Sequence, residues 1–573
     1  MRRAAPCGLL LLFAGCGGSD PPRMNAVLIT LDTTRYDALG CLGGRPGITP
    51  SLDNLAAESV VYEAARTVAP LTLPAHASML TGLYPPRHTV RDNALTPLPE
   101  AADTIAERAR AGGYQTGAVI ATRVLGDVYG LSQGFDDYDA PGNEDVERTR
   151  QFAERNAADV TASALAWLGE RDRERPFLLW VHYFDPHRPF ARDGPYLERA
   201  GGNPYLADVV MMDDGIGDLL DGLRADHDFE NTLVIVVGDH GEGLGDHGEA
   251  THSAFVYDST LRVPLMVRHP DGHRAGERSQ EIVSVADVFP TLIEALGLGG
   301  PGDVDGTSLY RRTVDPERGV YFESFYGHIY YHWSPMAGWV DAKGKYVHSS
   351  EPELYDPRSD PRESIDLAKE RAAEVERYRR ALARLGARTS LEPAGVKVDS
   401  AMIAELQKLG YSGGGWVGDL PGLLDESDQP APHARAAELD LLFRAWNATA
   451  RDDVEAAVDA FRQVLLFNPE NHEALSMLGL HLLDAGRPEE ALEPLERFGQ
   501  IGPTWTRTWQ GLARALDAVG RTDEALTWFD RALWIEPEDE VMLEKVIEIL
   551  RREGRTAEAI PYLRRLLEAR EKD

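Results

Sequence analysis

Three short apolar segments, each followed at once by acidic or histidine side chains, constrain the fold of this chain most strongly. The segments are residues 26–31, 177–184 and 232–237, and they lead into Asp32, into Asp185 and His187, and into Asp239 and His240. Apolar runs of this length, rich in branched residues, are typical of buried central strands. Amphipathic stretches lie between them, for example at 103–112 and 157–168. This alternation predicts an α/β fold with a mainly parallel sheet.

The polar residues after these segments form the first site hypothesis. Ligands of parallel sheets bind beyond the carboxyl ends of the strands, where consecutive strands deliver their last side chains. We therefore expect Asp32, Asp239 and His240 to converge on one divalent metal ion at that edge. His182 and His247 lie near the same segments, and we expect them to be hydrogen-bonded structural residues.

The C-terminal part of the chain contains an internal repeat of 34 residues. The period is carried by Pro469, Pro503 and Pro537, by Ala457, Ala491, Ala525 and Ala559, and by Gly486, Gly520 and Gly554. Each unit has the pattern of two amphipathic helices and resembles the tetratricopeptide repeat. We expect three complete units and a degenerate first one, stacked as an all-α solenoid over residues 436–573. Such stacks often bind protein partners, but they also act as spacers or as oligomer contacts.

The N-terminus has the pattern of an export signal. A basic start is followed by a short leucine-rich run that ends in Phe13-Ala14-Gly15-Cys16, which resembles a bacterial lipoprotein box. Residues 1–16 are therefore predicted to be a signal peptide that leaves Cys16 as a lipidated N-terminus, anchoring an exported protein in the bacterial cell envelope. The alternative is a plain secretory signal that releases a free protein. No later apolar run is long enough to span a bilayer.

The charge balance limits the partners. The chain has 573 residues and a formal charge of −34, which opposes binding to nucleic acid and to anionic surfaces. An anionic substrate therefore requires a local cationic centre, such as a metal ion. With three cysteines in the sequence, a disulfide framework is excluded.

Seven motifs, in the correct order over roughly residues 24–375, resemble the sulfatase family of the alkaline-phosphatase-like superfamily. They are the strand 25–37, the helix segment Thr72–Gly82, Asn93, the loop 185–189, the turn 238–242, Arg262–Leu265 and Glu353–Asp356. The resemblance implies a hydrolase domain over residues 24–385, followed by a linker at 386–435 that is rich in Gly, Pro, Asp and Ser. It also implies hydrolysis of sulfate or phosphate esters, with a small-molecule, glycan or lipid ester as substrate.

The resemblance assigns roles to individual residues. Thr72 occupies the nucleophile position and also contributes its oxygen to the metal held by Asp32, Asp239 and His240. His187, Asn93 and His76 are expected to bind substrate oxygens. His187, Asn93 and His252 are assigned to catalysis, with His252 as the general acid. A covalent intermediate on Thr72 is expected, followed by attack of water.

Thr72 departs from the sulfatase pattern, which requires Cys or Ser at this position to make formylglycine. Formylglycine is therefore not expected, and threonine favours phosphorus chemistry of the kind that related phosphodiesterases, phosphonate hydrolases and phosphoethanolamine transferases perform. His240 in the metal shell favours zinc or manganese, while calcium and magnesium stay open. A second metal held by Asp185, His187 and His252 is the less favoured version.

Two other functions fit the same motifs. The first alternative to the hydrolase is a transferase that moves a phospho-group to an acceptor alcohol, and the second is a catalytically degenerate envelope protein that acts through its repeats. The first would yield product on an acceptor alcohol, and the second would contain no metal.

Overall fold

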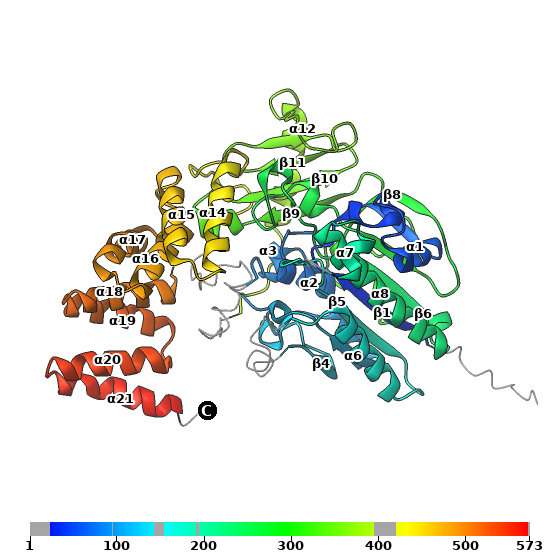
Figure 1. Ribbon diagram of the computed structural model, residues 1–573. Helices are drawn as coiled ribbons and strands as arrows, with labels where there is room; N and C mark the ends of the chain where they lie inside the picture. Colours follow the sequence, from blue (N-terminus) through cyan, green and yellow to red (C-terminus); the bar gives the residue numbers. More distant parts are fainter. Residues whose placement is uncertain are drawn as a thin grey trace, which may run out of the picture.

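A computed structural model describes residues 23–93, 96–141, 154–190, 194–394, 420–502 and 504–570. An α/β domain, a smaller antiparallel sheet and an array of helices follow one another along the chain (Figure 1). The proposed lipidation site Cys16 and residues 395–419 of the expected linker lie outside the described residues. Within the described part, no helix is both long and apolar enough to cross a membrane.

The α/β domain is built on an eight-stranded sheet, with strand order β4-β3-β5-β1-β6-β7-β2-β8. The strands are β1 (Asn25–Leu31), β2 (Val60–Arg66), β3 (Gln115–Val119), β4 (Asp137–Asp139), β5 (Phe177–Tyr183), β6 (Thr232–Gly238), β7 (Leu265–Arg268) and β8 (Arg278–Ser284). The pairs formed by β7 are antiparallel and the other pairs are parallel. The predicted α/β class with a mainly parallel sheet is therefore confirmed.

Helices cover both faces of this sheet because its strands are apolar on both sides. Ala26 and Leu28 of β1 pack into a core with α2 (Thr72–Thr81), α4 (Ile105–Ala111) and α10 (Val288–Ala295). The alternate residues Val27 and Ile29 pack into a second core with α1 (Pro50–Ala57), α6 (Ala157–Glu170) and α8 (Pro204–Ala225). The residues of β1 are buried along its whole length, as the continuous apolar run predicted.

A second sheet of four antiparallel strands completes the hydrolase part. Its order is β12-β11-β10-β9, formed by β9 (Gly319–Ser324), β10 (Met336–Asp341), β11 (Gly344–His348) and β12 (Glu353–Tyr355). Helix α12 (Ala372–Gly386) packs on it, and the Tyr378 hydroxyl donates to Asp341 Oδ1 at 2.8 Å. Helix α11 (Tyr326–Tyr331) follows β9 and faces the repeats.

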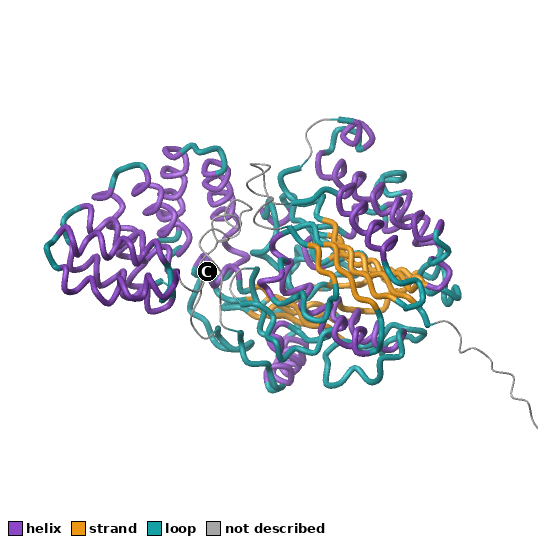
Figure 2. The backbone as a smooth tube through the Cα atoms, turned by 90° about the horizontal axis from the view of Figure 1, so that it is seen from below, coloured by secondary structure: helices purple, strands orange, loops and turns teal. Residues whose placement is uncertain are grey.

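The C-terminal helices form four pairs, so the expected all-α repeat array is confirmed (Figure 2). The pairs are α14 (Ala436–Thr449) with α15 (Val454–Phe467), α16 (His472–Asp484) with α17 (Pro488–Ile501), α18 (Thr506–Ala518) with α19 (Thr522–Ile535), and α20 (Glu540–Arg552) with α21 (Thr556–Arg570). The periodic alanines at 457, 491, 525 and 559 are fully buried, since a small side chain lets paired helices approach. Gly486, Gly520 and Gly554 adopt left-handed turns, and Asp452 takes the same conformation in the degenerate first pair.

The repeats are attached to the hydrolase part through a buried carboxylate. Glu438 on α14 is fully buried and accepts hydrogen bonds from Asn468 Nδ2 at 2.7 Å and Asn471 Nδ2 at 2.8 Å. Its second oxygen accepts from Trp333 Nε1 of the hydrolase part at 3.2 Å. Asn468 Nδ2 also donates to the Tyr331 carbonyl oxygen at 2.7 Å. One acid thus joins the first two repeats to the segment after β9.

Replacing Glu438 by alanine is expected to weaken this junction. The change leaves three buried donors without their acceptor, which costs about 3 kcal/mol and lowers the midpoint of thermal unfolding of the repeats by about 10 °C. Differential scanning calorimetry measures the shift. Glu455→Ala is the matched control, because its side chain is 74% exposed, and an equal shift in both variants would contradict the role of Glu438.

Candidate active site

The carboxyl ends of three adjacent strands place the predicted metal ligands side by side. β1 lies between β5 and β6 in parallel register. The chain continues this pairing past the strand ends, because Asp32 N donates to the Tyr183 carbonyl oxygen at 2.9 Å and Asp239 N donates to the Leu31 carbonyl oxygen at 3.2 Å. Asp32, Asp239 and His240 are fully buried, and their ligand atoms lie within 4.8 Å of one another. The expected convergence of these three residues is found.

Thr72 lies at the first position of α2, as its spacing before Pro74 predicted. Its Oγ1 is 3.4 Å from Asp32 Oδ2 and 3.3 Å from His240 Nε2. Asn93 lies at the same helix end, where its Oδ1 accepts from Leu73 N at 2.9 Å, and its buried Nδ2 has no hydrogen-bond partner among the described residues. A helix N-terminus also presents its positive dipole end to an anion. The hydroxyl, the amide and the dipole therefore point to one anionic ligand.

The donor set fits a divalent cation. Asp239 Oδ1 accepts from the backbone N–H groups of Thr33 at 3.2 Å and of His240 at 2.6 Å. Within the described part of the chain, Asp239 Oδ2 and Asp32 Oδ1 are buried and receive no hydrogen bond. His240 Nδ1 lies 3.0 Å from the Gly241 carbonyl oxygen, which fixes the proton there and leaves Nε2 as the lone-pair donor. Buried carboxylate oxygens without partners are costly unless a cation binds them.

The electrostatics point the same way. Burial raises the pKa of Asp32 to about 8, and burial together with the neighbouring Asp32 raises the pKa of Asp239 well above its usual value. Burial lowers the pKa of His240 well below its usual value, with a further lowering from His252. A neutral imidazole is the form that binds metal. A bound cation favours the ionised carboxylates, which removes the penalty of burying them.

A second set of ligand atoms lies beside the first. His76, His182 and Asp239 also have ligand atoms within 4.8 Å of one another. His182 Nε2 is 3.4 Å from Asp32 Oδ2, and neither of its ring nitrogens has a hydrogen-bond partner among the residues that the structure describes. Our expectation of a hydrogen-bonded His182 is wrong because the residue faces the acids and not the backbone. A histidine inside the apolar run 177–184 was the sequence signal for this role.

His187 and His252 lie next to the metal ligands. The ring centroid of His252 is 4.4 Å from that of His240 and 5.4 Å from that of His187. His252 Nδ1 lies 3.4 Å from Oε1 of the fully buried Glu242, and His187 stacks on Phe184 at 4.3 Å. The structure therefore brings together the two histidines that we assigned to catalysis.

His76 and Asp185 have more structural surroundings. His76 is buried, with its ring centroid 5.4 Å from that of Trp180 and its Nδ1 2.8 Å from the Thr72 carbonyl oxygen. Asp185 Oδ1 accepts from Ala157 N at 2.8 Å, at the start of α6. The metal-binding groups found among the described residues do not include a set of Asp185, His187 and His252, so the geometry gives no support to that version of a second metal.

Comparisons with known families agree with this geometry. Residues 24–298 match the family described as Sulfatase, and residues 245–385 match N-sulphoglucosamine sulphohydrolase, C-terminal. Residues 418–572 match Tetratricopeptide repeat. The matches follow the same order as the two sheets and the helix pairs.

Individual relatives cover most of the hydrolase part. The uncharacterized sulfatase YidJ of Escherichia coli (strain K12) is 27% identical over 427 residues, which is 60% of this chain and 83% of the relative. Human arylsulfatase A is 29% identical over 53% of this chain and 70% of its own length. The crystal structure of the phosphonate monoester hydrolase of Agrobacterium radiobacter has a TM-score of 0.51 at 23% identity, over 63% of this chain and 95% of that one.

These matches establish a sulfatase-like ester hydrolase of a family that is metal-dependent in general. A sulfatase domain, matched over residues 24–298 with a sulphohydrolase C-terminal part at 245–385, is thus followed in this chain by a tetratricopeptide-repeat domain.

Proposed function

We propose that this protein hydrolyses sulfate or phosphate esters with Thr72 as its nucleophile. The observation that carries the proposal is the position of Thr72 Oγ1, between Asp32 Oδ2 at 3.4 Å and His240 Nε2 at 3.3 Å. A hydroxyl in the metal ligand set, at a helix N-terminus, is placed to lose its proton and to attack an anionic ester.

Asp32, Asp239 and His240, together with the Thr72 oxygen, would hold one divalent ion, with zinc or manganese favoured by the histidine ligand. When bound, such an ion supplies Lewis-acid stabilisation of the threonine oxygen and of the ester oxygens. Asn93 Nδ2, which is buried and has no partner among the described residues, donates to a substrate oxygen. His76 on α2 and His187 in the loop after β5 bind other oxygens of the same substrate anion.

The chain's own residues then complete two steps. The Thr72 hydroxyl gives its proton to solvent water, and its oxygen forms a bond to sulfur or phosphorus while the bond from that atom to the alcohol oxygen breaks. His252 donates a proton to that leaving oxygen, and Glu242, 3.4 Å from His252 Nδ1, stabilises the protonated ring before the transfer. Water then cleaves the covalent ester on Thr72 and releases the inorganic anion.

The side chain at position 72 favours phosphorus over sulfur. Threonine cannot be converted to formylglycine in the way that Cys or Ser is in sulfatases. Relatives and structural neighbours include proteins named for sulfate esters and for phosphonate monoesters, so both ester classes belong in the assay.

Thr72→Ala is expected to lower turnover of aryl phosphate and aryl sulfate esters by about 10²-fold or more, because the nucleophile is lost. Steady-state assays of the purified protein measure kcat for each ester. Thr72→Ser is the matched control, since it keeps the hydroxyl, and we expect it to retain most of the turnover. Full activity of Thr72→Ala would remove this residue from the mechanism.

His240→Ala is expected to abolish metal binding, because it removes one of three buried ligands. Elemental analysis of the parent protein should find about one ion per chain, and chelation should lower turnover until zinc or manganese is added back. The control is His227→Asn, at an exposed histidine whose left-handed backbone conformation asparagine tolerates. Equal metal content in all three proteins would contradict the proposed ligand set. A ratio of two ions would assign the second to His76 and His182.

We also propose that the protein is exported and anchored through a lipid on Cys16. The support is the apolar run that ends in Phe13-Ala14-Gly15-Cys16. In a bacterial host fed labelled palmitate, Cys16→Ala should lose the label and leave the membrane fraction. The control Cys7→Ala, inside the same leader, should keep both the palmitate label and the membrane association. Label retained in the Cys16 variant would refute the anchor.

A further inference from the structure

A cavity of about 640 Å³ extends from the catalytic histidines to the first repeat helix. His187 and His252 line its inner side. On the opposite side lie Leu439, Phe443 and Trp446 of α14 and its C-cap residue Ala450. The ring of His252 lies 4.4 Å from that of the metal ligand His240. The cavity therefore reaches His252, the residue proposed to protonate the leaving alcohol.

The residues that α14 turns to the cavity form one stripe of the helix. Positions 439, 443, 446 and 450 recur every three or four residues, which places them on one face. Leu439, Phe443 and Trp446 are half-buried, whereas Ala445 is fully buried and Leu442, which also lines the cavity, is almost fully buried. Part of the apolar surface of this stripe is thus not covered by the packing of the repeats and faces the cavity.

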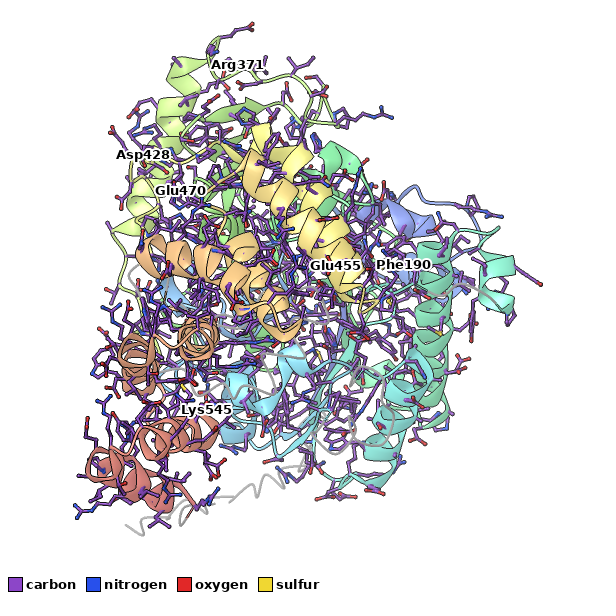
Figure 3. The ribbon with its side chains drawn as sticks, turned by 60° about the vertical axis from the view of Figure 1, so that its left-hand side comes forward. Phe190, Arg371, Asp428, Glu455, Glu470 and Lys545 are labelled. Atoms are coloured by element: carbon purple, nitrogen blue, oxygen red, sulfur yellow. The ribbon has the colours of Figure 1, made fainter. Side chains whose placement is uncertain are left out.

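Several contacts hold α14, which forms this side of the cavity, at a fixed distance from the active site. The Arg188 guanidinium carbon lies 4.9 Å from the ring centroid of Phe190 and 5.0 Å from that of Phe443 on α14. Figure 3 labels Phe190, next to the yellow ribbon of the first repeat helices. A side chain at Gly248, in the loop that leads to His252, would come within 2.8 Å of Ala436 at the start of α14. Together with the buried Glu438, these contacts attach the helix to both loops that carry the catalytic histidines.

We propose that the first repeat helix is one wall of the substrate site, and that Phe443 and Trp446 bind a ring of the ester's alcohol part. This inference rests on the proposed hydrolase function and adds its substrate class. The ring is released with the alcohol when the ester bond breaks, and the repeats thereby take part in substrate selection.

The size and the chemistry of the cavity define its occupant. Small-molecule sites typically have volumes of roughly 300–1,000 Å³, so this cavity admits an alcohol of about one or two rings. Flat aromatic side chains favour flat apolar faces, and Phe190, Tyr326 and Tyr331 add aromatic surface from the hydrolase part. Asn447 on α14 and Arg451 in the turn after it also line the cavity and supply donors for oxygens on the ring.

The test compares full-length variants on esters with and without a ring. Trp446→Ala should raise KM for 2-naphthyl phosphate or sulfate, or for a pyranose 6-phosphate or 6-sulfate, by about 10-fold, as expected when one aromatic contact is lost. The methyl esters, which cannot reach α14, should show unchanged kcat/KM. Trp534→Ala is the matched control, because Trp534 is a repeat tryptophan that is 80% exposed.

A second variant, at a different position, tests the same proposal in case Trp446→Ala misfolds. Ala450→Trp adds bulk at the exposed C-cap residue of α14, which lines the cavity, and it should raise KM for the ring-bearing esters by a similar factor. A shift with either the aryl or the pyranose esters supports the proposal and identifies the ring. Unchanged KM for both classes in both variants would overturn it.

Failure of the hydrolase function is separable from failure of this inference. If the parent protein cleaves none of these esters, calorimetric titration with 2-naphthol still reports on the cavity. Binding of 2-naphthol that is lost in Trp446→Ala but kept in Trp534→Ala supports the proposed role of α14 in ring binding, even if the protein shows no catalysis. Equal binding in both variants, or none in the parent, rejects it.

Discussion

The rest of the structure depends on the parallel pairing of β1 with β5 and β6. Parallel neighbours end at the same edge, so Asp32, the loop to His187, and Asp239 with His240 are delivered to one point without any long-range adjustment. The backbone hydrogen bonds of Asp32 and Asp239 extend the ladder by one residue beyond the strands. The ligand positions are therefore set by the sheet itself and not by a flexible loop.

This arrangement carries a cost in the absence of a cation. Two buried carboxylates and a neutral imidazole lie within 4.8 Å of one another, and burial disfavours the charged form of each acid. A cluster of this kind is difficult to explain as packing alone, because apolar residues of similar size would be more stable. Residues that oppose stability in this way cluster at functional sites.

Local patterns in the sequence were sufficient to predict the strands, the convergence of Asp32, Asp239 and His240, and the repeats. The run 26–31 is apolar on both faces, and the periodic alanines and glycines fix the helix pairs. The role of His182 was missed, because one histidine in a strand does not reveal which acids it will face. Glu438 and Trp446 were equally hidden, since their partners come from another domain and only the tertiary arrangement brings them together.

The wall formed by α14 separates two properties that usually reside on the same loops. The groups that we propose to make and break bonds lie at the strand ends, on α2 and in the loops after β5 and β6, whereas the surface proposed to face the alcohol belongs in part to a helix far along the chain. Substitutions on that helix can alter which molecules enter while the reacting centre stays intact. A repeat helix placed against a catalytic domain therefore allows the range of substrates to change in evolution while the catalytic residues stay the same.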